Sequence, residues 1–203
     1  MAKEDYSIKI VSKSSAKLLL DEYHYLSNIS KGFKSGYNYG LYVGDSLVGV
    51  CIFTGFPVPE LAKGCYGLER DQQQGLFELS RLCLVPNFQK SEHNLASWFV
   101  SRCIKLLRRE TVVRSILSYA DDSFHEGIVY RACNFKYYGL SVPKKDFWFK
   151  LEDGSYKKHT RGTVKGKVGE WRDRTRKRRY LLTYDKALVC RWQEVSWDKN
   201  KNK

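Results

Sequence analysis

Long apolar runs are absent from this chain. No stretch of its 203 residues approaches the roughly 18 consecutive apolar residues of a membrane-spanning helix. The opening residues, MAKEDYSIKI, lack the apolar core of a signal peptide. There is no internal repeat, and no low-complexity tract beyond the terminal DKNKNK. These absences argue against a membrane-spanning, secreted or repeat protein and favour a globular one.

Closely paired cysteines are also missing. The six cysteines are spaced 14, 18, 20, 30 and 57 residues apart, and none forms a CxxC pair. Zinc ribbons need such pairs. Several of the cysteines fall in expected strands or helices, where cysteine behaves as a small buried hydrophobe. We therefore expect reduced thiols at Cys51, Cys65, Cys83, Cys103, Cys133 and Cys190.

The chain does carry a large and unevenly placed positive charge. Its formal net charge is +14, and residues 157–179 alone hold eleven Lys/Arg against two acids, a net +9. Such a segment displaces condensed counterions from nucleic acid and so binds it with salt-sensitive affinity. The expected contacts are Lys157, Lys158, Arg161, Lys165, Lys167, Arg172, Arg176, Lys177, Arg178 and Arg179.

Aromatic residues are interleaved with these charges. Trp171 and Tyr180 are candidates for stacking on an exposed base. The alternative is a solvated basic face without a partner. An anionic membrane fits less well, because the segment has no apolar helical face. The density of cations favours nucleic acid.

Hydrophobic periodicity predicts an α/β domain. The chain is 42% hydrophobic and 14% aromatic, enough for one core plus an extension. Alternation predicts strands at residues 6–11, 39–43, 47–54 and 78–86, and Gly44-Asp45-Ser46 is a hairpin turn between the middle two. Ser14 or Ser15 is expected to cap a first helix, which buries Ala16, Leu19, Leu20 and Tyr23. A second helix has an apolar stripe of Leu95, Phe99, Cys103 and Leu106.

The remaining segments are expected to be irregular. Residues 57–76 are rich in Pro, Gly and Gln and predict a long loop that is functional or mobile. The polar stretch 87–94, NFQKSEHN, predicts a connecting loop. After Gly154 the composition turns basic, so we divide the chain into a domain over 1–154 and a basic extension over 155–203, packed on or tethered to that domain. A last strand is expected near residues 180–184.

The most informative segment is SYADDSFHEGIVYRACNFKYYG, residues 118–139. It starts as a strand, turns through Asp121 and Asp122, forms a short helix that carries Tyr130, and returns to a strand at Phe135. This order resembles the second half of a GNAT-type acyltransferase. In that fold the tyrosine points at the leaving group of the acyl donor.

Four motifs carry a closer resemblance. They are YHYLS (23–27), NYGLYVGDSLVGVCIFTGFP (38–57), ELSRLCLV (78–85) and the segment just described. In order and spacing they resemble the Mom family of bacteriophage DNA-modification proteins, a divergent GNAT-like group. The resemblance implies a GNAT-like mixed central sheet flanked by helices, to which this chain adds a basic C-terminal extension.

The same resemblance implies a function. Mom-type proteins add a small carbamoyl- or acyl-type group to the exocyclic amine of adenine in DNA and so protect it from host restriction. The expected partners are DNA and a small acyl or carbamoyl donor, with no membrane, in the cytoplasm of the infected bacterial cell. The alternatives are a GNAT-type N-acetyltransferase that acts on a protein or tRNA amine, and an inactive GNAT-fold protein that binds nucleic acid.

The loop expected to hold the donor departs from the GNAT pattern. That pattern reads Gln/Arg-x-x-Gly-x-Gly/Ala, whereas residues 89–94 read QKSEHN, so both small residues are missing and Glu92 adds a negative charge. The following helix N-terminus still offers N–H groups to an anion. An acyl-CoA-derived donor is one candidate, but the altered loop argues against acetyl-CoA bound in the standard manner. The expected donor contacts are Arg81, Ser91, His93 and Asn94.

Arg81 is the charged member of a strand. It alternates with Leu79, Cys83 and Val85 and is expected on their face of the sheet. A charge in that row must be paired or must point into a cleft. Its expected role is to bind a donor carboxylate or phosphate, and the alternative is an ion pair with Glu78.

Four residues are expected to carry the chemistry. His24 and Tyr25 match the family motif, and His24 is a candidate base or a ligand for a metal such as iron; the alternative is a helix-end histidine. Asp121 ends a strand on its carboxyl side, where open α/β sheets place their sites; the alternative is a turn residue. Tyr130 would protonate the departing group; the alternative is a ring packed beneath Phe135.

Overall fold

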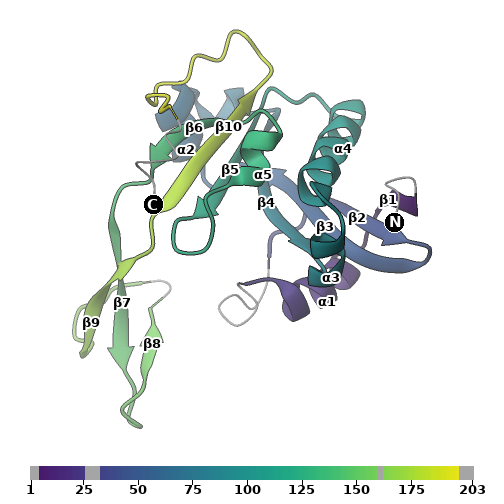
Figure 1. Ribbon diagram of the computed structural model, residues 1–203. Helices are drawn as coiled ribbons and strands as arrows, with labels where there is room; N and C mark the ends of the chain where they lie inside the picture. Colours follow the sequence, from purple (N-terminus) through teal and green to yellow (C-terminus); the bar gives the residue numbers. More distant parts are fainter. Residues whose placement is uncertain (1–4, 26–32, 160–161, 197–203) are drawn as a thin grey trace.

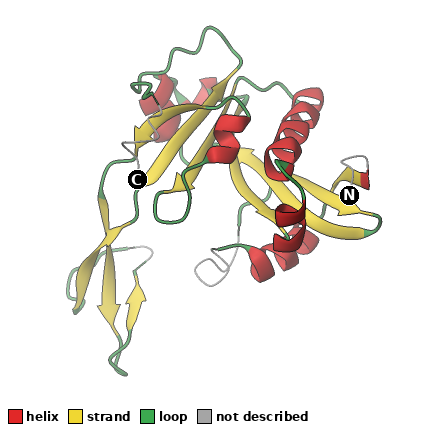
Figure 2. Cartoon of the chain, viewed as in Figure 1, coloured by secondary structure: helices red, strands yellow, loops and turns green. Residues whose placement is uncertain are grey.

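The computed structural model describes residues 5–25, 33–159 and 162–196. Its largest part is a seven-stranded sheet in the order β1-β2-β3-β4-β5-β10-β6 (Figures 1 and 2). All neighbouring strands are antiparallel except β4 and β5, which are parallel. The strands are β1 (Tyr6–Ile10), β2 (Tyr37–Val43), β3 (Ser46–Gly55), β4 (Leu76–Leu84), β5 (Ser115–Asp121), β6 (Lys136–Leu140) and β10 (Lys177–Thr183). The expected strands and hairpin are confirmed.

Helices cover both faces of this sheet. Strand β3 alternates, so that Ile52 packs with α1 (Lys13–Tyr23) and Phe53 packs with α4 (Leu95–Glu110) on the other side. Figure 1 shows α4 and the short α5 (Ile128–Ala132) together in front of the sheet. The core is therefore two apolar layers with the sheet between them.

The first helix begins earlier than expected. Ser12, rather than Ser14 or Ser15, is the cap, because its Oγ accepts a hydrogen bond from the N–H of Ser15 at 3.1 Å. Tyr23 is 39% exposed and does not belong to the buried stripe. The buried members are Ala16, Leu19 and Leu20.

The prediction of a long loop at residues 57–76 was wrong. It contains α2 (Pro59–Tyr66) and a single 3-10 turn, η2 (Arg70–Gln72). Proline suits the first turn of a helix, where its missing N–H has no partner to lose. The helix ends at Gly67, whose positive φ of 75° suits glycine. α2 is ordinary core, with Ala62, Cys65 and Tyr66 buried.

The polar stretch 87–94 was only partly a loop. A short helix, α3 (Pro86–Ser91), occupies most of it, again with proline at its start. The helix α4 then begins after Asn94, whose φ is 59°. None of the helices in the described ranges is long and apolar enough to cross a membrane.

Strand β10 lies beyond residue 154 but belongs to the large sheet. It is hydrogen-bonded to β5 on one side and to β6 on the other. Tyr180 on this strand is fully buried, and its hydroxyl donates to the carbonyl of Glu126. Tyr180 therefore cannot stack on a base, contrary to the expectation from its basic neighbours.

A second, three-stranded sheet is inserted between β6 and β10. It consists of β7 (Lys144–Lys150), β8 (Tyr156–Lys158) and β9 (Gly169–Arg174), in the order β8-β7-β9. Figure 1 shows it projecting from the large sheet at the lower left. We call residues 144–174 the basic arm, since they hold ten Lys/Arg against five Asp/Glu.

Candidate active site

The site begins where two parallel strands separate. β4 and β5 pair only from Leu76 to Leu79, opposite Ser115 to Ser118. The last paired residues are tied by a hydrogen bond of 3.1 Å from the Ser118 hydroxyl to the carbonyl of Leu79. Beyond this point lies a pocket of about 660 Å³. It is lined by residues 23–25 at the end of α1, residues 78–84 of β4, Tyr119 of β5, residues 125–130 around the start of α5, and Gln89, Ala96 and Lys177.

A bulge in β4 decides where Arg81 lies. Ile52 pairs with Arg81 and the next residue, Phe53, pairs with Leu79, so Ser80 is an extra residue. Paired residues share a face, which puts Arg81 on the α1 side and Leu79 on the α4 side. The expectation that the two share a face was therefore wrong. Arg81 lines the pocket, and its Nη1 donates to the carbonyl of Ser80 at 2.7 Å.

His24 follows α1 directly and faces the same pocket. Its backbone N–H caps the helix by donating to the carbonyl of Leu20 at 3.0 Å. The side chain is only 8% exposed. Burial, helped by the charge of Arg81, lowers the pKa of His24 to about 4. The imidazole is therefore neutral at pH 7.

Tyr25 lines the pocket next to His24 and packs against two neighbouring rings. It stacks on His24 with ring centroids 4.6 Å apart, and it contacts Phe124 at 4.9 Å. Burial and the charge of Asp121 raise the pKa of its phenol. The structure thus brings His24 and Tyr25 together with Arg81.

Tyr130 reaches the pocket from the first turn of α5. The ring is 7% exposed and packs on Phe135 at 5.8 Å and on Tyr180 at 5.4 Å. Its hydroxyl lies 3.5 Å from the carbonyl oxygen of Tyr119, a long hydrogen bond. Burial raises the pKa of Tyr130 well above its ordinary value, against the effect of a hydrogen bond with Ser118. The phenol therefore keeps its proton at neutral pH.

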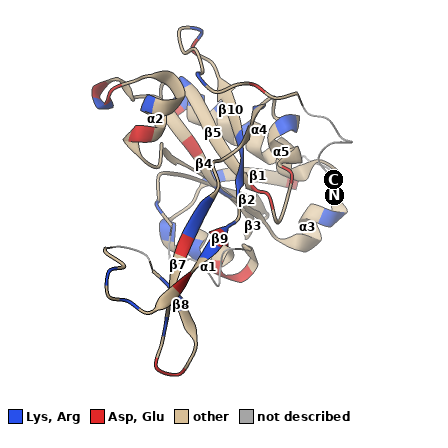
Figure 3. Cartoon of the chain, turned by 90° about the vertical axis from the view of Figure 1, so that its left-hand side faces the viewer, with Lys and Arg blue, Asp and Glu red and all other residues tan. Residues whose placement is uncertain are grey.

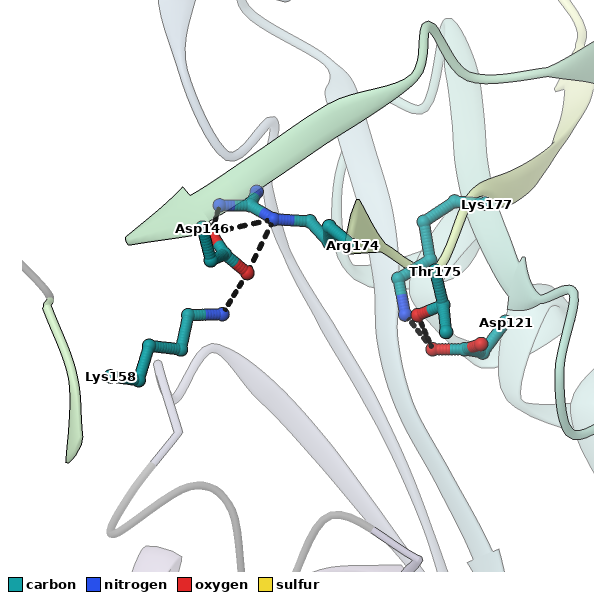
Figure 4. A network of polar contacts seen from close by, with 6 residues as sticks. All are labelled: Asp121, Asp146, Lys158, Arg174, Thr175 and Lys177. Atoms are coloured by element: carbon teal, nitrogen blue, oxygen red, sulfur yellow. Dashed lines mark hydrogen bonds and ion pairs between the residues drawn. The ribbon is translucent and has the colours of Figure 1, made fainter. Parts of the chain in front are cut away.

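Asp121 does not line the pocket; its carboxylate is bound by two residues that directly follow the basic arm. Its carboxylate is 3% exposed and accepts hydrogen bonds from Thr175 at 3.1 Å and from the ammonium group of Lys177 (Figure 4). Burial alone would raise the pKa of Asp121. The hydrogen bonds from Lys177, the N–H of Ser123 and Thr175 outweigh burial, so the net shift of the pKa is downward. It is a firmly ionised group, and Lys177 is the partner that lines the pocket.

Two pocket residues were missed by the sequence reasoning. His125 has its ring centroid 6.1 Å from that of Tyr25 and 6.4 Å from that of Tyr130. Burial and Lys177 lower the pKa of His125, while Asp121 acts in the opposite direction. Glu78 also lines the pocket, and burial raises its pKa against the charge of Arg81. His125 stands inside the most informative sequence segment, residues 118–139, where a histidine between a turn and a helix has no periodic signal that marks it.

Three of the four expected donor residues lie off the pocket. Ser91, His93 and Asn94 are all exposed, and none of them lines it. The pocket instead reaches Gln89 and Ala96 on either side of them. Asn94 makes no side-chain cap to α4. Of the four residues expected to contact the donor, only Arg81 lines the same pocket as the catalytic candidates.

The end of the basic run is engaged within the chain. Arg178 is buried and pairs with Asp122 at 2.6 Å. Arg179 donates to the carbonyl of Tyr138 at 2.6 Å, and Arg176 donates to that of Ser141 at 2.7 Å. Their assignment to nucleic-acid contact stays a prediction. The more exposed cations lie on the basic arm, of which Arg161 falls outside the described residues.

The metal expectation for His24 finds no support. Among the residues that the structure describes, no group of three or more His, Cys, Asp or Glu side chains is arranged to hold a metal ion. The six cysteines are free thiols, as expected. Cys65 and Cys190 approach one another, with their sulfurs 3.6 Å apart.

The fold matches solved acetyltransferases. The ribosomal-protein-S18-alanine N-acetyltransferase from Escherichia coli superposes with a TM-score of 0.51 over 89% of this chain and 94% of its own, at 11% identity. A putative acetyltransferase from Salmonella typhimurium, solved with acetyl-CoA, gives 0.51 over 90% and 95%, also at 11% identity. A Bacillus subtilis acetyltransferase in complex with CoA gives 0.50 over 88% and 97%, at 14% identity. The expected GNAT-like mixed sheet is confirmed.

The sequence gives the narrower assignment. The model of the Mom protein family matches residues 5–192. This chain therefore belongs to the Mom protein family. No curated protein sequence matches it.

Proposed function

We propose that this chain transfers a small carbamoyl- or acyl-type group to the exocyclic amine of adenine in DNA, as the family resemblance implies. The observation that carries the proposal is the convergence of His24, Tyr25, Arg81 and Tyr130 on one pocket. They come from α1, β4 and α5, segments far apart in the sequence. A packing role alone gives no reason for two imidazoles, two phenols and a guanidinium to meet at a strand separation.

The target amine sets the first chemical requirement. Its lone pair is delocalised into the purine ring, so the amine must lose a proton as it attacks. His24 and His125 are both neutral at pH 7, because burial lowers their pKa values, and a neutral imidazole accepts a proton. At His125 the charge of Asp121 opposes the lowering of the pKa and so favours the protonated form that a base becomes.

Tyr130 meets the second requirement, a proton for the departing group. Its raised pKa keeps the phenol protonated at neutral pH. The hydroxyl makes a long contact of 3.5 Å to the carbonyl of Tyr119 and a hydrogen bond with Ser118. Both partners are neutral groups, so the cost of turning the hydroxyl to a leaving group in the pocket is modest. Arg81 is placed to bind the negative charge of the donor.

The donor is proposed only by its chemical class. The N-terminus of α4 reaches the pocket through Ala96, and its first N–H groups suit an anion such as a phosphate. Ser91, His93 and Asn94 lie off the pocket, so an acyl-CoA would take a pose different from the usual one. We therefore expect purified protein to bind acetyl-CoA weakly in calorimetry, and a low-micromolar Kd would favour an ordinary acetyltransferase.

The DNA must present its base to this pocket. A base inside a duplex is out of reach, so the target is flipped or locally unpaired. The test is mass spectrometry of nucleosides from DNA of cells that express the chain. A modified deoxyadenosine supports the proposal. Unmodified DNA with intact DNA binding would favour an inactive binder, and acylated protein or tRNA would favour an N-acetyltransferase.

A further inference from the structure

The basic arm has two chemically different faces, which the strand register defines. In an antiparallel sheet directly paired residues point to the same side. Asp146 pairs with Arg172, and Trp148 pairs with Lys158, so these residues share one face. Phe147 pairs with Trp171, and Phe149 pairs with Lys157, so these occupy the other. No helix of the described chain forms more than minor contacts with the arm's strands.

The first face neutralises its own charges. Asp146 accepts hydrogen bonds from Arg174 Nε at 2.9 and 3.0 Å, and it pairs with Lys158 at 2.5 Å (Figure 4). The bond from Arg174 is the main reason that the pKa of Asp146 falls to about 2. Arg172 pairs with Glu170 at 2.6 Å and lies 4.8 Å over the ring of Trp148. Lys158, Arg172 and Arg174 are thus paired with carboxylates, so we call this the ion-paired face.

The second face keeps its cations available. Trp171 is 57% exposed, although its ring packs edge-on against Phe147 at 5.3 Å. Lys157 and Lys167 form no ion pair with any residue that the structure describes, and Lys167 lies 5.6 Å over the ring of Phe149. The one ion pair here, between Lys145 and Asp173, is 3.7 Å long and well exposed. We call this the tryptophan face.

Residues 175–177, which follow the arm directly, are hydrogen-bonded to residues at the end of β5, next to the pocket. Thr175 and Lys177 both donate to Asp121, and the N–H of Asp122 donates to the carbonyl of Arg176 at 3.1 Å. Lys177 lines the pocket itself. These hydrogen bonds hold the end of the arm beside the pocket, so a ligand bound to the arm lies near the pocket. Figure 3 shows Lys and Arg residues along the arm's strands and loops.

We propose that the tryptophan face binds DNA beside the target base, with Lys157 and Lys167 on phosphates and Trp171 stacked on an unpaired neighbouring base. This inference rests on the proposed function, because DNA is the substrate there. Free cations next to an exposed ring are the two elements of single-strand and opened-duplex binding. On the ion-paired face Lys158, Arg172 and Arg174 all lie beside carboxylates, and its other two cations, Lys144 and Lys150, stand at the two ends of β7.

The chain offers a matched control for the charges. Lys157→Gln with Lys167→Gln removes two cations from the tryptophan face. Lys144→Gln with Lys150→Gln removes two equally exposed cations, and the register assigns Lys144 and Lys150 to the ion-paired face. Binding of the full chain to a duplex with a short unpaired bubble is measured by fluorescence anisotropy over a salt series. Thermal melting of both variants checks that they are folded.

The two double variants should separate clearly. The tryptophan-face pair should reduce the log–log salt slope by nearly 2, because each phosphate contact contributes about 0.9. The control pair should leave the slope close to that of the parent chain. Equal losses in both variants, or no loss in either, would overturn the assignment of this face.

Trp171 supplies an independent readout. Trp171→Ala should weaken binding of the bubble duplex by roughly 5- to 150-fold, the range for one base stacked on an aromatic ring. Trp171→Phe should retain most of the affinity, and a fully paired duplex should be affected less. An equal loss on both duplexes would contradict stacking.

The failure of this inference can be told from failure of the proposed function. If the parent chain binds DNA and modifies adenine in cells but the variants bind like the control, only the face is wrong. If DNA binding follows the tryptophan face while nucleosides stay unmodified, only the reaction is wrong. A parent chain that prefers RNA over DNA in competition would overturn both.

Discussion

The pocket and the basic arm use ionisable groups in opposite ways. In the pocket, burial holds His24 and Tyr130 in their neutral forms. On the arm, Lys157 and Trp171 are exposed, and no helix of the described chain covers them. The chemistry proposed for the pocket thus depends on desolvation, whereas the DNA affinity proposed for the arm depends on charges left in water. Substitutions should therefore change reaction rate in one region and salt-dependent binding in the other.

The largest effect is expected at Tyr130. Tyr130→Phe keeps the buried ring and removes the hydroxyl that bonds to Tyr119 and Ser118, so stability should fall by about 1–2 kcal/mol. Loss of the proton source should lower adenine modification roughly 10²–10⁴-fold. Nucleoside mass spectrometry gives the modification level and thermal melting gives the stability. DNA binding is the internal control, because the arm is unchanged. Parent-level modification would make Tyr130 a packing residue, and Tyr25 would be the next acid to test.

The next effect should appear as a pH dependence of stability. The pKa of His24 is about 4 in the folded chain, against an ordinary value of 6.5. As the pH falls from 6.5 to 4 the unfolded chain takes up the proton first, so stability falls, by about 3 kcal/mol in total. Above pH 6.5 this contribution is fully present. Urea titrations of the parent and of His24→Gln should diverge over this window, and parallel curves would show that His24 is not buried as described.

A smaller loss of stability is expected at the joint between the two regions. Asp121→Asn removes the carboxylate that holds Thr175 and Lys177. Hydrogen bonds to a charged group contribute about 2 kcal/mol, so the urea midpoint should fall accordingly. Asp121→Asn combined with Lys177→Gln should recover part of that loss, since no cation is then left without its partner. An unchanged urea midpoint together with loss of adenine modification would indicate that Asp121 has a catalytic role instead of a structural one.

The corresponding change on the arm should remain local. Asp146 also binds two cations, Lys158 and Arg174, but the sheet around it is separate from the main core. Asp146→Asn should loosen the arm by about 1–2 kcal/mol while the global unfolding midpoint stays near that of the parent chain. Limited proteolysis, with cleavage mapped by mass spectrometry, measures the local opening. Destabilisation of the whole chain would show that arm and core unfold together.

The smallest effect concerns a thiol outside both regions. A hydrogen bond from Cys65 lowers the pKa of Cys190 to about 7, and the charge of Arg179 acts in the same direction. The other cysteines are buried. At pH 7.5 iodoacetamide should therefore label Cys190 first, as peptide mapping would reveal. Arg179→Gln should slow this labelling a few-fold, whereas labelling of Cys133 ahead of Cys190 would contradict the assignment.

The sequence predicted best what depends on local pattern. The hairpin of β2 and β3, the helix from Leu95 and the strand before Asp121 were all expected from alternation or a helical stripe. α2 was missed because Pro59 suggested a break, although proline is favoured at a helix start. In each correct case the signal lay within a few consecutive residues.

What the sequence could not predict depends on distant partners. The bulge at Ser80 exists only relative to β3, and it moves Arg81 to the other face of the sheet. His125 enters the pocket because β5 and α5 are held in place by β10, more than 50 residues further along the chain. Likewise, Arg178 looked like a free cation until its partner Asp122 was placed beside it. Local periodicity carries none of these relations.

The position of β10 has a consequence for how this protein is made. The strand fills the space between β5 and β6, yet the chain reaches it only after the whole arm has been synthesised. Closing such a long loop costs entropy before any contact repays it, and non-local strand pairing slows folding. A nascent chain that ends before Lys177 leaves the edges of β5 and β6 unpaired, and open strand edges promote aggregation. A longer arm would add to this loop-closure cost, whatever its effect on DNA binding.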